Sequence, residues 1–208
     1  MKSGNAVRRA IVVLRSEGLE SFWFKLLGEI GYRRLLLLER PLTQPISELR
    51  PELSVRIDTL KENEVRDYLA FRPETGHVRI MEALQSGQTC FVARHESRIV
   101  SAGWIAGRRP RIDYLGCELE LAANEAYLFD AFTLPAYRGQ GIAPALCLQQ
   151  LRHLRQAGYG RAIRGTVPEN KSALHAHAKS GFRPVAMMGT LRIGPWQKNI
   201  RRPWTDRT

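Results

Sequence analysis

Residues 129–146 constrain what this chain can fold into more than any other stretch of it. Apolar and aromatic residues run up to Leu134 and stop at a proline, a pattern that is typical of a buried strand. Gly139 and Gly141 follow, and glycine permits backbone angles and close approaches that a Cβ atom would block. Pro144 is tolerated in the first turn of a helix, because N–H groups there have no intrahelical partner. The stretch therefore predicts a strand, a tight glycine-rich turn and the start of a helix.

This turn has the character of an anion site. Free N–H groups, a helix N-terminus and the side chain of Arg138 converge on it, and all three favour negative charge. A phosphate or a pyrophosphate would suit it. The spacing lacks the Lys-Ser/Thr of a P-loop and the three glycines of the dinucleotide fingerprint. A plain strand-to-helix turn with an exposed arginine is the alternative interpretation.

The composition is that of a globular chain with a strong basic excess. Its 208 residues are 44% hydrophobic, which suits one domain plus an extension. The net charge of +12 favours anionic partners such as nucleic acid, a membrane surface or a phosphorylated ligand. The three cysteines are widely spaced, so we expect a reducing cytoplasm, no disulfide framework and no metal site. No apolar run is long enough to span a membrane, and early charges interrupt any signal-peptide core.

The two ends of the chain differ from its middle. Bulky apolar residues recur at helical spacing near the N-terminus, and prolines then punctuate a linker. We therefore expect a helical extension over residues 1–50, packed on the main domain or on a second subunit in a homodimer. A second interpretation is an interfacial membrane helix within residues 1–40. Residues 196–208 are expected to form a basic peripheral tail.

Between residues 51 and 195 the pattern alternates between strands and helices. We expect a strand near 55–60, helices at 61–71 and 77–84, a hairpin of strands at 89–94 and 98–106, a basic loop at 108–111, an edge strand or cleft wall at 118–121, a central strand at 125–134, a helix at 141–157, a strand at 162–167, a helix opened by 168–170, and a final strand at 182–193. This order predicts an α/β domain (α+β, with a mixed sheet) whose central strand leads into the glycine turn.

Two motifs in this order resemble those of one known family. Arg138-x-x-Gly141-x-Ala143, directly after a strand, resembles the pyrophosphate loop Arg/Gln-x-x-Gly-x-Gly/Ala of the GCN5-related N-acetyltransferase (GNAT) superfamily. Asn170-x-x-Ala173-x-x-Ala176-His177-x-x-x-Gly181-Phe182 resembles the later GNAT segment Asn-x-x-Ala-x-x-Leu-Tyr-x-x-x-Gly-Phe. The resemblance covers residues 53–193 and implies a GNAT-like acyltransferase domain over residues 51–195.

The resemblance also implies a donor and its binding residues. Acetyl-CoA, or another acyl-CoA, would lie in a cleft where the sheet splays open beside a bulge in the central strand. A small-molecule or peptide amine would be the acceptor. The residues implied in CoA binding are Phe132, Thr133 and Leu134 for the pantetheine, Arg138, Gly139, Gln140, Gly141, Ile142 and Ala143 for the pyrophosphate, and Asn170 for the CoA arm.

Such a transfer needs a base for the attacking amine and benefits from an acid for the departing thiolate. His177 stands where the family usually has the tyrosine acid, and a surface or packing histidine is the alternative. Gly165 stands where some relatives carry a glutamate base. We therefore expect Asp130, an ionisable residue in an apolar strand, to replace it; pairing with an arginine is the alternative. Further candidates are Glu118, Glu120 and Glu125.

The predicted function is an acyl-CoA-dependent N-acyltransferase. A non-catalytic CoA-binding or interaction module is the alternative, because the usual tyrosine and glutamate are missing. A nucleic-acid binder is disfavoured, since the arginines are scattered without an aromatic-interleaved stripe. Acceptor specificity is expected from the loops around residues 71–78 and 107–124.

Overall fold

The computed structural model describes residues 31–193 and 195–205. Its strands are β1 (Tyr32–Pro41), β2 (Arg56–Thr59), β3 (Thr89–His95), β4 (Arg98–Gly107), β5 (Arg111–Ile112), β6 (Cys117–Glu118), β7 (Glu125–Thr133), β8 (Arg161–Thr166), β9 (Arg183–Ile193) and β10 (Trp196–Pro203). Its helices are α2 (Val65–Phe71), α3 (His77–Gln85), α4 (Ile142–Gln156) and α5 (Lys171–Lys179), with short 3-10 turns at Glu62–Glu64, Pro73–Thr75 and Pro135–Tyr137. The predicted α/β class and mixed sheet are confirmed.

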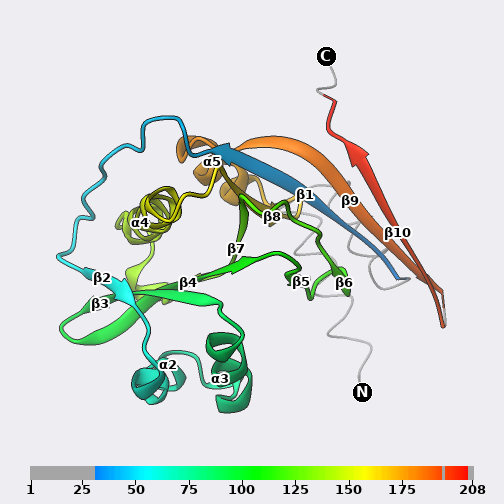
Figure 1. The fold of residues 1–208 in the computed structure, drawn as a ribbon. Helices are drawn as coiled ribbons and strands as arrows, with labels where there is room; N and C mark the ends of the chain where they lie inside the picture. Colours follow the sequence, from blue (N-terminus) through cyan, green and yellow to red (C-terminus); the bar gives the residue numbers. More distant parts are fainter. Residues whose placement is uncertain (1–30, 194, 206–208) are drawn as a thin grey trace, which may run out of the picture.

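In the described part of the chain, eight strands form one sheet in the order β10-β9-β1-β8-β7-β4-β3-β2, and β5 and β6 form a separate two-stranded ribbon. Strands β7 and β8 run parallel, whereas the other neighbours in the large sheet are antiparallel. Figure 1 shows α4 on one side of the β3–β4 half of the sheet and α2 with α3 on the other. The sheet is therefore the middle layer of the fold.

Each face of the sheet carries its own core. On one face, α4 buries Leu146 and Leu151 against strand residues such as Leu36 and Leu128. On the other face, α2 and α3 pack on β3 and β4, and the β5–β6 ribbon covers β1, β7 and β8. The predicted strand at 125–134 and helix at 141–157 correspond to β7 and α4, which together position the glycine turn.

Strand β1 corrects the expected helical extension. The run Leu35–Leu38 lies in a strand that pairs with β8 on one side and β9 on the other. All four leucines are buried, because a strand covered on both faces needs apolar side chains at successive positions. The helical prediction is therefore wrong for residues 32–41. Its remainder within residues 1–30, together with most of the interfacial-helix interpretation, lies outside the described residues.

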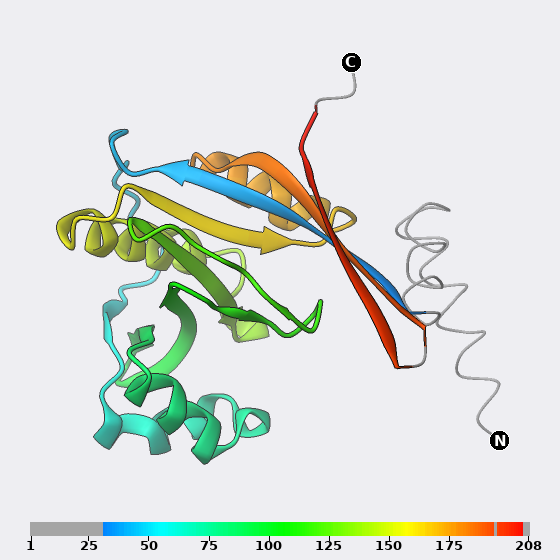
Figure 2. The ribbon, with the colours of Figure 1, turned by 45° about the vertical axis from the view of Figure 1, so that its right-hand side comes forward.

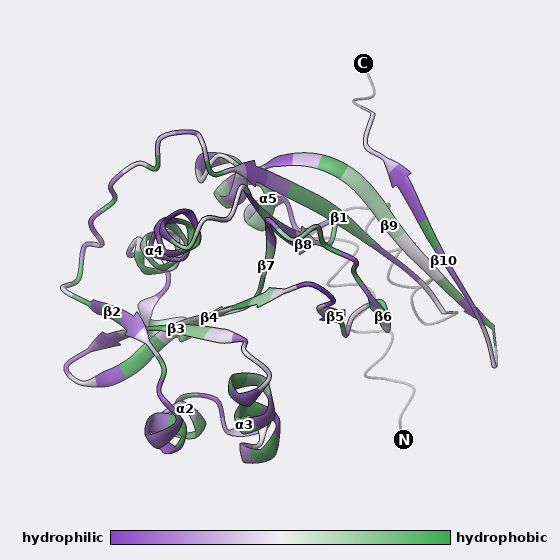
Figure 3. Cartoon of the chain, in the orientation of Figure 1, coloured by the Kyte–Doolittle hydropathy of each residue, from purple (hydrophilic) through white to green (hydrophobic). Residues whose placement is uncertain are grey.

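The C-terminal segment is also part of the sheet. Instead of a peripheral tail, β10 forms an antiparallel ladder with β9 from Trp196 to Pro203. Figure 3 shows β10 as largely hydrophilic, in contrast to the leucine-rich part of β1. The basic loop at 108–111 likewise contributes Arg111 to β5, which pairs with β6.

None of the described helices combines the length and the hydropathy that a membrane crossing requires.

Candidate functional site

The site begins where two parallel strands separate. Strands β7 and β8 pair only from Glu125–Arg161 to Leu128–Arg164, and beyond that point no ladder joins them in the described chain. Strand β8 continues as far as Thr166 but pairs there only with β1. Figure 2 shows the two halves of the sheet at an angle to one another. This separation leaves one edge of β7 open next to the glycine turn.

A β-bulge lies at the same place. Phe129 pairs with Trp104 and Phe132 with Ala102, so that two residues of β7 oppose the single residue between these partners on β4. Asp130, the first of the two, has φ +47°. Left-handed backbone is unfavourable for most residues, and aspartate is among the few that tolerate it. The bulge therefore turns the end of β7 at the point where β8 leaves it.

Hydrogen bonds with β4 decide which backbone groups face the open edge. The N–H of Leu134 donates to Val100 O at 2.9 Å, and Ser101 Oγ donates to Phe132 O at 3.0 Å. Since successive residues in a strand point their polar groups to opposite edges, those of Ala131 and Thr133 face the side of β8. The N–H of Leu134 is thus already engaged, and Ala131, which the sequence did not single out, takes its place at the open edge.

The glycine turn has the conformation that its sequence predicts. Gly139 has φ +81° and Gly141 has φ +74°, and α4 begins at the next residue, Ile142. Within residues 31–193 and 195–205, the N–H groups of residues 139–143 have no hydrogen-bond acceptor. The N–H of Glu52 donates to Gln140 O at 3.1 Å and fixes the turn from behind. The turn therefore presents free donors at a helix N-terminus, as an anion site requires.

The two polar side chains of the turn fold back onto it. Arg138 Nε donates to Thr133 O at 3.1 Å, and its guanidinium lies 5.8 Å from the ring centroid of Phe132. Gln140 Nε2 donates to Ala136 O at 3.3 Å. Arg138 is exposed, so its charge stays close to the free N–H groups and accessible to a ligand.

Asn170 and His177 lie on the helix that follows β8. Asn170 is the N-cap of α5, where its Oδ1 accepts from the N–H of Ala173 at 3.0 Å. Its side chain is exposed, and its amide NH₂ has no acceptor in the described part of the chain. The helix cap therefore leaves that NH₂ free to donate to a ligand, and the predicted role of Asn170 in holding the CoA arm stays a prediction.

His177 is half-buried against Phe182, with ring centroids 6.2 Å apart. Burial, and then the positive charge of Arg164, lower the pKa of His177 to about 3. The imidazole is therefore neutral near pH 7, which argues against an imidazolium acid and favours the packing alternative.

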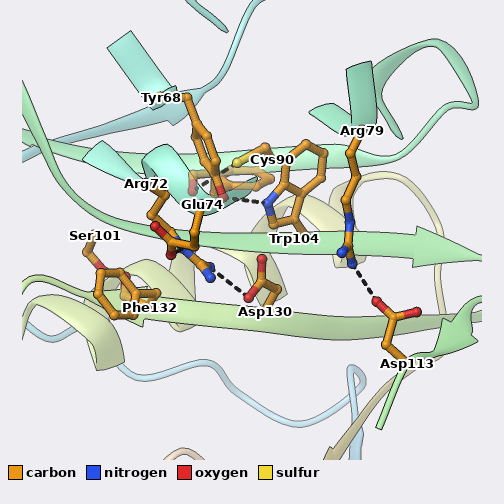
Figure 4. Close-up of polar contacts among 11 residues, drawn as sticks. Tyr68, Arg72, Glu74, Arg79, Cys90, Ser101, Trp104, Asp113, Asp130 and Phe132 are labelled. Atoms are coloured by element: carbon orange, nitrogen blue, oxygen red, sulfur yellow. Dashed lines mark hydrogen bonds and ion pairs between the residues drawn. The ribbon is translucent and has the colours of Figure 1, made fainter. Parts of the chain in front are cut away.

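Asp130 is paired with an arginine. Arg72, at the end of α2, donates to Asp130 Oδ1 at 2.7 Å and to Glu74 Oε1 at 2.9 Å (Figure 4). The same guanidinium lies 4.9 Å from the ring centroid of Phe132. Partial burial opposes the charge on Arg72, but the hydrogen bonds to the two carboxylates outweigh it and raise the pKa of Arg72. Arg72 is thus a permanent cation that orients the carboxylate of Asp130.

A cleft of about 860 Å³ opens beside this pair. Its floor is aromatic: the rings of Tyr127 and Phe129 stack 5.9 Å apart with 9° between their planes, and Trp104 lies beside them. Both loops predicted to set acceptor specificity contribute to the walls. The lining includes Arg72, Glu74 and Thr75 from the first loop and Pro110, Arg111, Ile112, Asp113 and Tyr114 from the second. Asp130 also lines the cleft, which therefore meets the bulge at its carboxylate.

Packing explains why β8 carries a glycine where a glutamate base was considered. A Cβ atom on Gly165 would overlap Leu35 Cδ2 and lie 2.9 Å from Tyr127 Oη. Burial raises the pKa of Tyr127 to about 12, so the phenol stays protonated. Like Ala131, Tyr127 and Arg72 are site residues that sequence reasoning missed. The available signal for Tyr127 was its position two residues before Phe129, which places both aromatic rings on the same face of the strand.

The other sequence candidates lie away from the cleft lining. Glu120 pairs with Arg109 at 3.1 Å, and Glu125 pairs with Arg161 at 2.5 Å. Glu118 belongs to the β5–β6 ribbon. Cys147 is buried, and burial raises the pKa of its thiol, which suits a core residue.

Comparison with known proteins agrees with this geometry. The sequence profile of the acetyltransferase (GNAT) family matches residues 57–182. A mycothiol acetyltransferase from Rhodococcus jostii is 28% identical over 177 residues, which are 75% of this chain and 55% of that protein. The chain thus spans about half the length of this curated relative.

Solved structures share the fold at low sequence identity. A GNAT protein from Sphaerobacter thermophilus has a TM-score of 0.57 at 15% identity, covering 88% of this chain and 56% of that one. A putative GNAT acetyltransferase from Novosphingobium aromaticivorans has a TM-score of 0.54 at 20% identity, covering 76% of this chain and 65% of that one. An aminoglycoside N-acetyltransferase in complex with CoA has a TM-score of 0.51 at 21% identity, covering 62% of this chain and 91% of that one. With its family profile matched over more than half of its length, its diverging strands and its glycine turn, this chain belongs to the acetyltransferase (GNAT) family.

Proposed function

We propose that this protein is an N-acetyltransferase that moves the acetyl group of acetyl-CoA onto an amine bound in the cleft beside Asp130. The observation that carries the proposal is the meeting of three features at one end of β7. These are the free N–H groups of the glycine turn, the open strand edge, and an aromatic-floored cleft. The family membership supports the same reaction class.

The donor would lie along the open edge of β7. The N–H groups of residues 139–143 would hold its pyrophosphate, because they have no other acceptor among the described residues. Backbone groups of Ala131 and Thr133 would bond the pantetheine as an added strand does. The thioester would then reach the bulge, where Asp130 borders the cleft. Contacts with CoA that lie far from the reacting atoms would in this way align the thioester carbonyl with the acceptor.

The reaction itself is a direct transfer. The amine nitrogen attacks the thioester carbon and forms a C–N bond, and the carbonyl oxygen becomes the oxyanion of a tetrahedral intermediate. When the intermediate collapses, the C–S bond breaks and the sulfur takes the electron pair as CoA thiolate. A protonated acceptor first loses one proton to solvent, and Asp130 receives the second proton from the attacking nitrogen, directly or through one water, while Arg72 fixes the orientation of Asp130. Because His177 is neutral near pH 7, the thiolate leaves without protonation by this side chain.

The charges of the cleft favour a cationic acceptor. Its lining holds four carboxylates (Glu74, Glu82, Asp113 and Asp130) and three arginines (Arg72, Arg79 and Arg111). The cleft is thus slightly acidic in a chain whose net charge is +12. An amine is protonated in water near neutral pH, so local negative charge raises its concentration at the site. The aromatic floor would contact the apolar part of the same molecule.

Release of free thiol from acetyl-CoA tests the proposal. The full-length protein is mixed with acetyl-CoA and a panel of primary amines that differ in charge and in apolar area. We expect acceptor-dependent thiol release, with cationic amines that carry a ring or an apolar chain as the best substrates. CoA binding without turnover of any amine would instead support a non-catalytic CoA-binding module. Absence of both binding and turnover would contradict the assignment of the glycine turn as well.

A further inference from the structure

The β9–β10 hairpin forms one outer edge of the sheet, and none of its residues lines the cleft. Its ladder runs from Trp196 opposite Ile193 at the turn to Pro203 opposite Ala186 at the far end. Strand β10 is the last in the sheet, and Figure 2 shows the hairpin running together with β1 past the end of β8. The end of the hairpin marked by Ile193 and Trp196 is therefore available for contact with another surface.

Two large apolar side chains are exposed at this turn. Ile193 is 62% exposed and Trp196 is 54% exposed, and as directly opposed residues they share one face of the hairpin. Side chains alternate along a strand, so Lys198 and Arg202 lie on that same face behind Trp196. The face therefore combines an apolar tip with a basic flank.

The hairpin carries positive charge without any carboxylate. Residues 183–203 contain five basic residues and no aspartate or glutamate. Arg183 pairs with Glu39. In the described part of the chain the other four make no ion pair; these hairpin cations are Arg192, Lys198, Arg201 and Arg202. Four unneutralised charges on one hairpin attract a dense array of anions.

Protection of a sheet edge accounts for only part of this arrangement. Charged residues and proline on an edge strand prevent pairing with other chains, which would explain Lys198, Arg201 and Pro203. An exposed isoleucine next to an exposed tryptophan has the opposite effect, because it adds apolar surface at the edge. A second role is needed to explain this tip pair, Ile193 and Trp196.

We propose that the β9–β10 hairpin docks onto an anionic lipid surface, with the tip pair entering the headgroup region and the hairpin cations binding the lipid phosphates. Tryptophan favours the membrane interface, where its ring is partly apolar and its N–H remains hydrated. Basic side chains next to an apolar insertion add electrostatic attraction to the same surface. Single-stranded RNA is disfavoured as the partner, because Ile193 lacks a flat ring on which a base could stack.

Docking of the hairpin would hold one wall of the cleft near the lipid. Gln197 Nε2 donates to Gly116 O at 3.4 Å and so joins β10 to the β5–β6 ribbon. Arg33, on the neighbouring β1, donates to Tyr114 O at 2.9 Å, and Tyr114 lines the cleft. An acceptor displayed at a membrane would therefore lie within reach of the docked protein.

Vesicle co-sedimentation of the full-length protein tests the proposal. The probes are phosphatidylcholine vesicles with and without phosphatidylglycerol, and a single-stranded RNA followed by fluorescence anisotropy. The tip variant is Ile193→Ser/Trp196→Ser, and the charge variant is Lys198→Gln/Arg201→Gln/Arg202→Gln. The control variant Arg66→Gln/Arg98→Gln/Arg155→Gln removes the same charge from exposed positions elsewhere.

We expect the wild type and the control variant to bind the vesicles that contain phosphatidylglycerol equally well, and neither to bind vesicles of phosphatidylcholine alone. The charge variant should bind roughly a hundredfold more weakly, because each basic side chain near an anionic surface contributes on the order of 1 kcal/mol. The tip variant should lose sedimentation at moderate salt. In the wild type, a blue shift of tryptophan emission on vesicle binding would place the Trp196 ring in the interface. Trp196→Phe should retain binding but lose this shift.

Three results would overturn the proposal: no binding to either vesicle, equal losses in the charge and control variants, or RNA binding that depends on the hairpin while vesicle binding does not. Thermal unfolding by circular dichroism shows whether each variant is folded, and Trp196→Phe remains informative if the serine variant unfolds. None of these readouts depends on acetyl transfer.

Discussion

Asp130 is the residue at which the local conformation, the ion pair and the cleft coincide. Its φ of +47° follows from the bulge, and its carboxylate is held by Arg72 and faces the cleft. Backbone strain of this kind persists where the surrounding structure imposes it, and it is common at functional sites. In a regular strand the Asp130 side chain would lie on the face opposite to that of Phe129, because successive side chains alternate between the two faces.

Asp130→Asn tests the proposed base. Asparagine has nearly the same shape and also tolerates left-handed backbone, so the bulge should persist. Loss of the carboxylate should lower turnover roughly a hundredfold, the order that a positioned general base contributes. Affinity for CoA, measured by titration calorimetry, should be unchanged. Glu120→Gln, which removes a carboxylate outside the cleft, should leave turnover as it is; an equally active Asp130→Asn would exclude Asp130 as the base.

His177→Phe should leave turnover near neutral pH unchanged but alter the response of stability to acid. Burial and Arg164 lower the pKa of His177 from 6.5 to about 3. Between these values the unfolded chain binds a proton that the folded chain excludes, so stability falls as the pH drops through this window. From about pH 7 to about pH 5, the wild type should lose about 1 to 2 kcal/mol more than the variant, after allowance for partial exposure.

Urea unfolding of both proteins at the two pH values measures this difference. Parallel losses would show that the imidazole titrates normally in the folded state, and reduced turnover in His177→Phe would restore a catalytic role for the side chain.

At the scale of elements, the site depends on a strand end and a helix start being joined by one short turn. The bulge ends the regular part of β7, the left-handed glycines reverse the chain, and α4 starts with its donors free. Each step follows from local residue types, and each directs backbone groups to the same side. Leu49 and Pro51 lie next to the turn, because a Cβ atom added to Gly141 would come 3.4 Å from Leu49 Cδ2 and 3.5 Å from Pro51 Cα.

Gly139→Ala tests whether this turn holds the donor. The φ of Gly139 is +81° and an added Cβ would meet no atom within 4 Å, so the methyl strains only the backbone, by about 1 to 2 kcal/mol. We expect the turn to relax and CoA to bind roughly tenfold more weakly in titration calorimetry. Gly158→Ala is the matched control, with φ +85°, open space and a position after the far end of α4. Equal effects of the two substitutions on CoA affinity would contradict the role of the turn.

At the scale of the whole molecule, one strand from the N-terminal segment joins the C-terminal strands to the rest of the sheet. Strand β1 lies between β8 and β9, and its leucines enter the cores on both faces. Glu39 extends the connection through ion pairs with Arg161 of β8 and Arg183 of β9. The C-terminal β9–β10 hairpin is therefore attached to the rest of the sheet through β1.

A chain that begins at Pro51 should therefore fail to fold cooperatively. It lacks the four buried leucines of β1, which together contribute roughly 6 to 12 kcal/mol, and domains are stable by only about 5 to 15 kcal/mol. A chain that ends at Pro195 lacks only the edge strand β10 and should remain folded and bind CoA. Thermal unfolding by circular dichroism compares the two. Cooperative unfolding and CoA binding by the chain from Pro51 would show that β1 is dispensable.

The sequence by itself determined the features that depend on a few neighbouring residues. Gly139 and Gly141 permit their left-handed backbone angles wherever the chain runs, and Asn170 caps the helix that it precedes. The order of strands and helices between residues 51 and 193 was predictable for the same reason, because each element shows its own periodicity.

Only the tertiary structure decided the rest. The run Leu35–Leu38 suits a helix or a buried strand until the edges of β8 and β9 are there to pair with it. Arg72 and Asp130 lie 58 positions apart, and no local pattern connects them. The pKa of His177 depends on how far packing against Phe182 removes its ring from water. Pairing register, long-range ion pairs and burial are properties of the assembled sheet, so they fixed the partner of Asp130, the cleft and the place of β1.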